Sequence, residues 1–276
     1  MLTSGLGILV YKNIDTIGHQ AILLFIALIC AGSFVYCNKN KEPFATSRVA
    51  SPNALFDYVL LLGCSMFIIF IAYLQYQYNV FGDRYGLATF FPMVVLFLSA
   101  YYFDHLGILS MAITSFGAWL GITITPLRIL EANDFNSSRI IFTGLFLGAL
   151  LIFIGWITRR KEIKSHFEFT YSNFGLHVLL ISCLAAMFQF PYLPWFLLLA
   201  GVVTFFYFKA LKEKSFYFLL MISLYSYIAV SYVFINFLER TGGGMGAIYL
   251  GFIYFIASAI GLVIFLININ KKIKAA

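Results

Sequence analysis

The chain has 276 residues, of which 62% are hydrophobic and 11% are charged. A soluble domain carries about 45–50% apolar and about 25% charged residues, so this composition excludes an ordinary water-soluble fold. The net charge of +7 resides in short stretches between apolar segments, which leaves no basic domain for a nucleic acid. We therefore expect membrane lipids as neighbours, and other membrane proteins or a second copy of the chain as protein partners.

Nine apolar segments have the length that crosses a hydrocarbon layer about 30 Å thick. They are predicted at residues 20–37, 54–78, 86–103, 106–127, 138–158, 173–190, 192–209, 215–238 and 246–268. Inside lipid every backbone N–H and C=O needs a partner, and unbroken Phe, Leu and Ile runs meet this need as helices. The sequence therefore predicts an all-α, polytopic transmembrane helical bundle.

Two boundaries between these segments are short. A single helix over 86–127 would be about 63 Å long, twice the bilayer core, so Asp104 and His105 are predicted to form a turn. Pro191 and Pro194 remove backbone donors and divide the sixth segment from the seventh.

The Lys and Arg residues separate unequally between the two sides of the predicted bundle. Five lie on one side, at Lys12, Arg84, Arg128, Arg139 and Arg240. Thirteen lie on the other, at Lys39, Lys41, Arg48, Arg159, Arg160, Lys161, Lys164, Lys209, Lys212, Lys214, Lys271, Lys272 and Lys274. By the positive-inside rule the N-terminus is outside and the C-terminus is cytoplasmic.

We expect one membrane domain. Residues 1–19 form an interfacial or partly inserted segment, residues 20–270 the transmembrane helical domain, and residues 271–276 a basic cytoplasmic tail. Small residues four apart, such as Gly144 and Gly148, predict close helix approach. The four cysteines fall inside predicted helices without metal-ligand spacing, so we expect small core residues at Cys30, Cys37, Cys64 and Cys183.

Two stretches carry a resemblance to a known family. They are KNIDTIGH at residues 12–19, followed by an apolar helix, and YFDHLGILS at 102–110, which runs on to AWLG at 118–121. They resemble the predicted bacterial membrane proteins grouped as domain of unknown function 2157, mainly over the N-terminal half. The resemblance implies a multi-pass protein of the bacterial inner membrane. It brings no catalytic residues, because that family has no established activity.

The last helices hold a polar set at helical spacing. Tyr225, Tyr232, Asn236 and Glu239 share one helix face, and Arg240 lies beside them. One interpretation is a ligand-binding groove that opens outward. The other is an interfacial tyrosine girdle with an ion pair at a helix end, because Tyr is enriched at membrane interfaces.

Asp57 and His177 are candidate ionisable groups at membrane depth. A carboxylate at the bilayer centre costs about 2.5–3.5 kcal/mol, so Asp57 either pairs near the helix end, for example with Arg48, or lies deeper and binds protons. His177 is expected one turn into its segment, and a bis-histidine haem site would need a second such residue. Asp104 and His105 are either a turn cap or an acid–base pair. We expect no metal and no cofactor.

The outward loops carry mixed charges that suit a polar head group. They are Asp15, Asp83, Arg84, Glu131, Asp134 and Arg139, although solvated loops carry the same residues. Two functions remain open. The first is a non-enzymatic protein, either a carrier for a small molecule or lipid or a structural partner in an envelope complex. The second is a membrane-embedded enzyme acting on lipid-linked or head-group substrates from outside, with Glu239 and Asp134 as acid and base.

Overall fold

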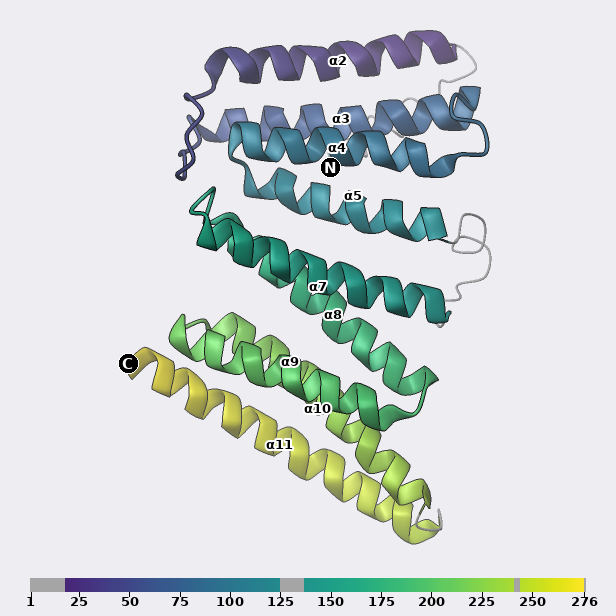
Figure 1. The fold of residues 1–276 in the computed structure, drawn as a ribbon, viewed down its shortest axis with the longest axis vertical. Coiled ribbons are helices and arrows are strands. Elements are labelled where there is room, and N and C mark those ends of the chain that lie inside the picture. Colours follow the sequence, from purple (N-terminus) through teal and green to yellow (C-terminus); the bar gives the residue numbers. More distant parts are fainter. Residues whose placement is uncertain (1–17, 125–136, 241–243, 276) are drawn as a thin grey trace. The chain divides into compact units, whose positions relative to one another are not determined.

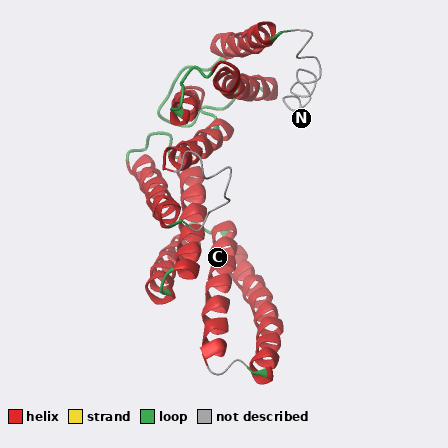
Figure 2. Cartoon of the chain, turned by 90° about the vertical axis from the view of Figure 1, so that its right-hand side faces the viewer, coloured by secondary structure: helices red, strands yellow, loops and turns green. Residues whose placement is uncertain are grey.

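The computed structural model describes residues 18–124, 137–240 and 244–275, with side chains to residue 273. These residues form nine helices and no strand (Figure 2). With the labels of Figure 1, they are α2 (His19–Asn40), α3 (Ala54–Tyr78), α4 (Tyr85–Phe103), α5 (Leu106–Ile124), α7 (Ser138–Arg160), α8 (Phe167–Gln189), α9 (Tyr192–Lys212), α10 (Phe216–Arg240) and α11 (Met245–Ala275). All nine are long and apolar enough to cross a membrane, which confirms the predicted all-α transmembrane architecture.

The chain divides into two compact units, residues 1–176 and 177–276, and the division falls inside α8. In the first unit α3 packs against both α2 and α4, α4 packs against α5, and α5 packs against α7 (Figure 1). In the second unit α10 packs against both α9 and α11.

The two short boundaries are confirmed. Asp104 ends α4 in the left-handed conformation, and α5 begins two residues later. α8 ends at Gln189 and α9 begins at Tyr192. Pro194 lies in the first turn of α9, where a helix needs no N–H from it.

α8 begins six residues earlier than predicted, at Phe167 instead of residue 173. The prediction was wrong here because residues 167–172 carry polar side chains that lower the local hydrophobicity. The structure accommodates them by contact with neighbouring elements. Glu168 pairs with Arg159 of α7 at 3.2 Å, and Ser172 is buried.

Two helices of the first unit pack closely at a pair of glycines. A Cβ atom on Gly175 of α8 would lie 2.9 Å from the carbonyl oxygen of Gly148 on α7, so these helices approach by backbone contact, as the glycine spacing predicted for Gly148. The cysteines are unpaired, and Cys37, Cys64 and Cys183 are fully buried among core side chains, as expected.

Candidate functional site at the lysine-rich end of the first unit

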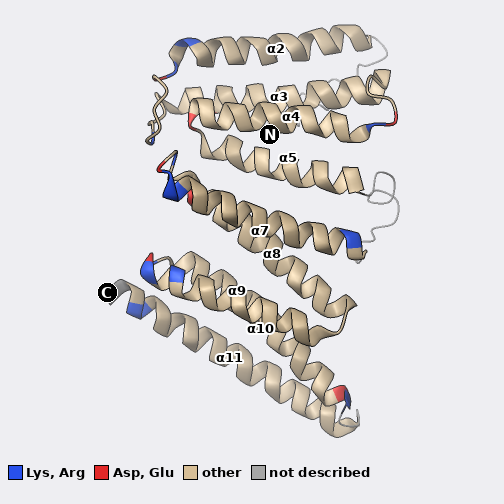
Figure 3. Ribbon diagram, in the orientation of Figure 1, with Lys and Arg blue, Asp and Glu red and all other residues tan. Residues whose placement is uncertain are grey.

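Charged residues lie at the helix ends (Figure 3). In the first unit α2 ends with Lys39 in its last turn and α7 ends with Arg159 and Arg160. The connections that follow these helices meet, because the Lys164 N–H donates to the carbonyl of Thr46 at 2.7 Å. We call this the lysine-rich end. It comprises loop 41–53, the turn at 104–105 and loop 161–166.

A buried ion pair joins the three connections of the lysine-rich end. Nζ of Lys164 lies 3.0 Å from Oδ2 of Asp104, with side-chain exposures of 1% and 2%. Lys164 also donates to the Ser47 carbonyl, and Asp104 accepts the Val49 N–H. Nε2 of His166 lies 2.8 Å from Oδ1 of Asp104. We call Asp104, Lys164 and His166 the buried cluster.

The backbone of the buried cluster is strained. Asp104 and Lys164 have φ values of 57° and 51°, in the left-handed region that costs L-residues about 1–2 kcal/mol each. At Asp104 this conformation ends α4, and the cap N–H bonds to the Ala100 carbonyl. Since the pair is almost closed to solvent, it has no room for a substrate and its role is to fasten the connections.

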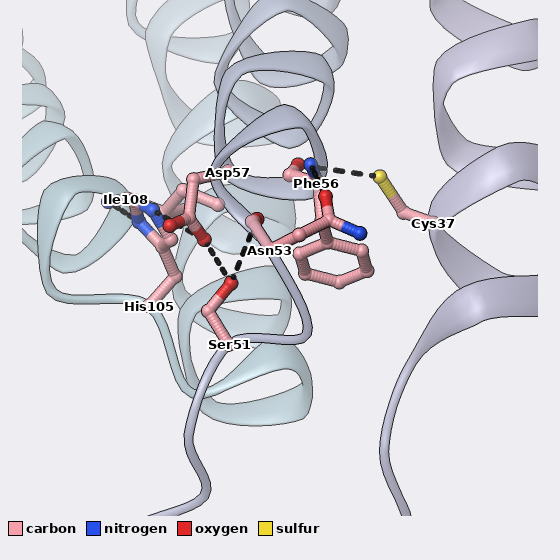
Figure 4. A network of polar contacts seen from close by, with 7 residues as sticks. All are labelled: Cys37, Ser51, Asn53, Phe56, Asp57, His105 and Ile108. Carbon is pink, nitrogen blue, oxygen red and sulfur yellow. Dashed lines mark hydrogen bonds and ion pairs between the residues drawn. The ribbon is translucent and has the colours of Figure 1, made fainter.

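A second polar network connects the start of α3 with the start of α5 (Figure 4). The Ser51 hydroxyl donates to Oδ1 of Asp57 at 2.5 Å, and Nε2 of His105 lies 3.5 Å from the same oxygen. Asp57 occupies the first turn of α3, where a carboxylate also interacts favourably with the helix dipole. Asp57 is therefore a helix-end residue with local partners, Ser51 and His105, and the pairing with Arg48 suggested by the sequence is replaced by these contacts.

His105 caps α5. Its Nδ1 accepts the Ile108 N–H at 3.2 Å, which satisfies one backbone donor of the first helical turn. This contact requires Nδ1 to be unprotonated. Burial lowers the pKa of His105, and the nearby Asp57 carboxylate opposes that shift. The capping interpretation of this turn is confirmed.

The start of α3 is capped in a similar way and touches α2 (Figure 4). Oδ1 of Asn53 accepts the Phe56 N–H at 2.8 Å. The Phe56 carbonyl, in turn, lies 4.0 Å from the Cys37 sulfur on α2. These contacts place the last turn of α2 beside the first turn of α3.

An apolar groove of about 650 Å³ opens next to the cluster. It arises because α2 and α4 both pack on α3. The residues that line this α2–α4 groove are Phe34, Val35, Asn38, Phe44, Leu98, Ser99, Tyr101, Tyr102 and Phe103. Its volume is within the range of about 300–1,000 Å³ that holds small ligands in proteins.

The end of the α2–α4 groove nearest the loops is polar. The Tyr102 hydroxyl donates to Oδ1 of Asn38 at 3.0 Å. Nζ of Lys41 lies 3.6 Å from the centre of the Tyr102 ring, a cation–π contact. Phe44 belongs to the groove wall and lies 5.1 Å from Nζ of Lys164, so the buried cluster supports one end of the groove.

A second groove, of about 560 Å³, lies between α3, α4 and α5. Its lining is neutral and includes Gln75, Tyr76, Tyr85, Thr89 and Ser115. Gln75 and Tyr76 belong to the end of α3 and Tyr85 and Thr89 to the start of α4, opposite the lysine-rich end, whereas Ser115 belongs to α5.

His177 lies deeper than the sequence predicted, because α8 begins ten residues before it. Its Nδ1 lies 2.9 Å from the Tyr225 hydroxyl and its Nε2 lies 3.4 Å from the Tyr217 hydroxyl, both on α10. His177 is therefore bonded to neutral hydroxyl groups near the middle of a span.

The predicted polar face of α10 divides between two partners. Tyr225 contacts His177, whereas the Tyr232 ring and the Arg240 guanidinium both approach the Tyr192 ring. The Asn236 amide donates to the carbonyl of Tyr232, one helical turn earlier. Glu239 is exposed at the end of the helix. A ligand-binding role for this set stays a prediction.

The predicted outer polar cluster is only partly described. Asp15, Glu131 and Asp134 lie outside the described residues, so the pairing of Asp134 with Glu239 in an enzyme site stays a prediction. Asp83 and Arg84 lie in the turn between α3 and α4. Arg139 lies in the first turn of α7. Among the described residues, no three His, Cys, Asp or Glu side chains form a metal-binding group.

Sequence reasoning missed the part played by Lys164. In the sequence it is one basic residue in the basic stretch 159–164, which is typical of a cytoplasmic loop. Its partner Asp104 is 60 positions away, and neither residue carries a spacing that indicates the contact. The α2–α4 groove was missed for the same reason, since its walls come from separate apolar helices.

Comparison with known proteins gives one match. The family model described as Predicted membrane protein (DUF2157) matches residues 1–109, which confirms the resemblance over that range. All residues that line the α2–α4 groove fall within it, whereas Lys164 and His166 lie beyond it. Neither a curated protein nor a solved structure matches the chain.

Proposed function

We propose that this membrane protein is non-enzymatic and carries a lipid or another amphiphile, whose apolar chain occupies the α2–α4 groove. The observation that supports the proposal is the groove itself, with apolar walls and a polar end beside the lysine-rich loops. In a bilayer an apolar groove of this volume is filled by hydrocarbon, because water gains no hydrogen bonds there.

The setting of the groove supports a carrier in the bacterial inner membrane. The thirteen Lys and Arg residues on one side of the predicted bundle favour a cytoplasmic position for the lysine-rich end. The groove then opens toward the inner leaflet. A role as a structural partner in an envelope complex is the alternative if the groove holds no specific molecule.

The test is photocrosslinking in nanodiscs with a phospholipid that carries a photoreactive group on its acyl chain. We expect labelled peptides from the C-terminal halves of α2 and α4. Val35→Trp places a large ring in the groove and should reduce this labelling severalfold. Leu28→Trp is the matched control, because Leu28 lies seven residues earlier on the same face of α2 and outside the groove lining. Their side chains are similarly exposed, at 54% for Val35 and 62% for Leu28.

Two results would contradict the carrier proposal. One is labelling spread evenly over all lipid-facing helices. The other is equal labelling of the two tryptophan variants. Either would leave the structural-partner role as the better explanation of the bundle.

A further inference from the structure

We propose that the occupant of the α2–α4 groove is an anionic phospholipid, and that the Lys41 ammonium binds its phosphate. The inference rests on the proposed function, since it names the head group of the molecule whose chain fills the groove. It is carried by the position of Lys41 and by the charge balance around it.

Lys41 follows the last residue of α2 and is not itself a lining residue of the groove; it reaches the groove through Tyr102, which lines it. Its Nζ is held over the Tyr102 ring at 3.6 Å, and Tyr102 is itself fixed by its hydrogen bond to Asn38. At this distance the ammonium directs part of its N–H donors at the ring face and leaves those on the outer side available to another acceptor. Lys41 can therefore donate to a phosphate while it remains on the ring.

Two acidic residues at or next to the lysine-rich end, Asp104 and Asp57, are already engaged. Asp104 is buried against Lys164, and Asp57 is bound to Ser51 and His105. Glu168 pairs with Arg159 of α7.

Loop 41–53 and the last turn of α2 thus keep an excess of positive charge. They contain three basic residues, Lys39, Lys41 and Arg48, and one acidic residue, Glu42. An anionic head group complements this excess, and a zwitterionic one complements it less. The inner leaflet supplies such lipids, and each lysine near its surface favours binding to them.

The chain of the same lipid fits the rest of the groove. Beyond Asn38 and Tyr102 the walls are apolar, with Phe34, Val35 and Leu98 along them. A molecule with its phosphate at Lys41 therefore places its acyl chain toward the bilayer centre. Neither groove has a charged lining residue. They differ in that Lys41 lies over the Tyr102 ring at the end of the α2–α4 groove, so the second groove serves as an internal reference.

The experiment uses the full chain in phosphatidylcholine nanodiscs and two photoreactive phospholipids with identical chains. One has a phosphatidylglycerol head group and the other a phosphatidylcholine head group. We expect the anionic probe to label the α2–α4 groove preferentially, and both probes to label the second groove equally. Lys41→Gln should reduce the preference about fivefold, the effect of one lysine near an anionic surface.

Two control variants separate a specific contact from a general field. Lys161→Gln removes an exposed charge from the same end without touching the groove and should keep the preference. Lys41→Arg keeps the charge and the ring contact, so it should keep the stronger labelling by the anionic probe. This control shows that the position tolerates substitution.

The outcomes distinguish the two proposals. Equal labelling of the groove by both probes overturns the anionic head group and leaves the groove as a chain-binding site. Equal loss in Lys41→Gln and Lys161→Gln shows a diffuse surface charge and overturns the role of Lys41. Failure of both probes to label the groove above other lipid-facing helices overturns the proposed function and this inference together.

Discussion

The two units of this protein satisfy their polar groups differently. In the first unit a charged pair, Asp104 and Lys164, is buried at the helix ends and ties three connections together. In the described part of the second unit the buried polar residues are Ser182 and Ser231, and neutral hydroxyls bond within the spans, as in Ser231 with Tyr254.

The difference shows what each position in a membrane permits. A charge buried at a helix end is covered by protein and not by lipid. A side chain of opposite charge and the backbone groups of nearby loops can therefore bind it. In the middle of a span the backbone groups are already bonded within the helix, so they cannot compensate a charge. Hydrogen bonds between neutral side chains form there instead, and each contributes about 0.6 kcal/mol on average. The first unit should therefore depend on a few strong contacts, and the second on many weak ones.

The largest effect should follow from breaking the buried cluster. Lys164→Met leaves the Asp104 carboxylate buried without its ammonium, which costs about 3–5 kcal/mol of unfolding free energy. Reversible unfolding in mixed micelles, followed by circular dichroism, measures this loss. Lys161→Met, in the same loop but exposed, is the control and should change stability by less than about 0.5 kcal/mol.

A double variant sharpens the interpretation of the cluster. Asp104→Leu combined with Lys164→Met removes both charges, and we expect it to recover most of the stability that the single variant loses. If the double variant is as unstable as Lys164→Met, the backbone contacts to loop 41–53, and not the ion pair, hold the connections together.

The next effect concerns helix approach. Gly175→Ala would place a Cβ atom 2.9 Å from the Gly148 carbonyl oxygen, so α7 and α8 must separate at a cost of about 1–3 kcal/mol. Gly201→Ala in α9 is the matched control in the second unit, because it has open space around it. That substitution should be neutral or stabilise by up to about 1 kcal/mol. Equal losses in the two variants would contradict the tight packing of α7 on α8.

Hydroxyl bonds of the second unit should contribute less. Ser231→Ala removes the 3.0 Å contact with the Tyr254 hydroxyl and should cost about 0.6 kcal/mol, and less than about 1.7 kcal/mol. Mixed-micelle unfolding again provides the measurement. A loss as large as that of Lys164→Met would remove the contrast between the units.

The smallest effect should be a dependence on pH through His105. Its pKa in the folded protein is below the ordinary value, so the unfolded chain binds the proton more tightly. Above the ordinary pKa both states are neutral and stability is unaffected, whereas stability falls as the pH drops below it. His105→Asn keeps a helix cap without a titrating group. The difference in unfolding free energy between the two proteins should therefore grow between pH 7 and pH 5, and a constant difference would contradict the assignment.

The helices could be predicted from the sequence, but several contacts could not. Segment 54–78 was predicted at its observed limits, and the turn at Asp104 followed from length alone. The start of α8 was missed because Glu168 and Ser172 look unsuited to a span until their partners are known. For Asp57 the sequence leaves two interpretations open, a paired carboxylate near the helix end and a deeper proton-binding group. Its partners Ser51 and His105 are visible only in the structure.

The sequence by itself determined that these segments are membrane helices, because hydrocarbon obliges each segment to satisfy its own backbone, and that is a local property. The tertiary structure alone decided that Lys164 forms a buried ion pair with Asp104 and that a groove lies between α2 and α4. Apolar helices carry little information about which neighbours they choose, since lipid tails are as apolar as their side chains. Such choices depend on shape and on a few polar contacts between distant residues.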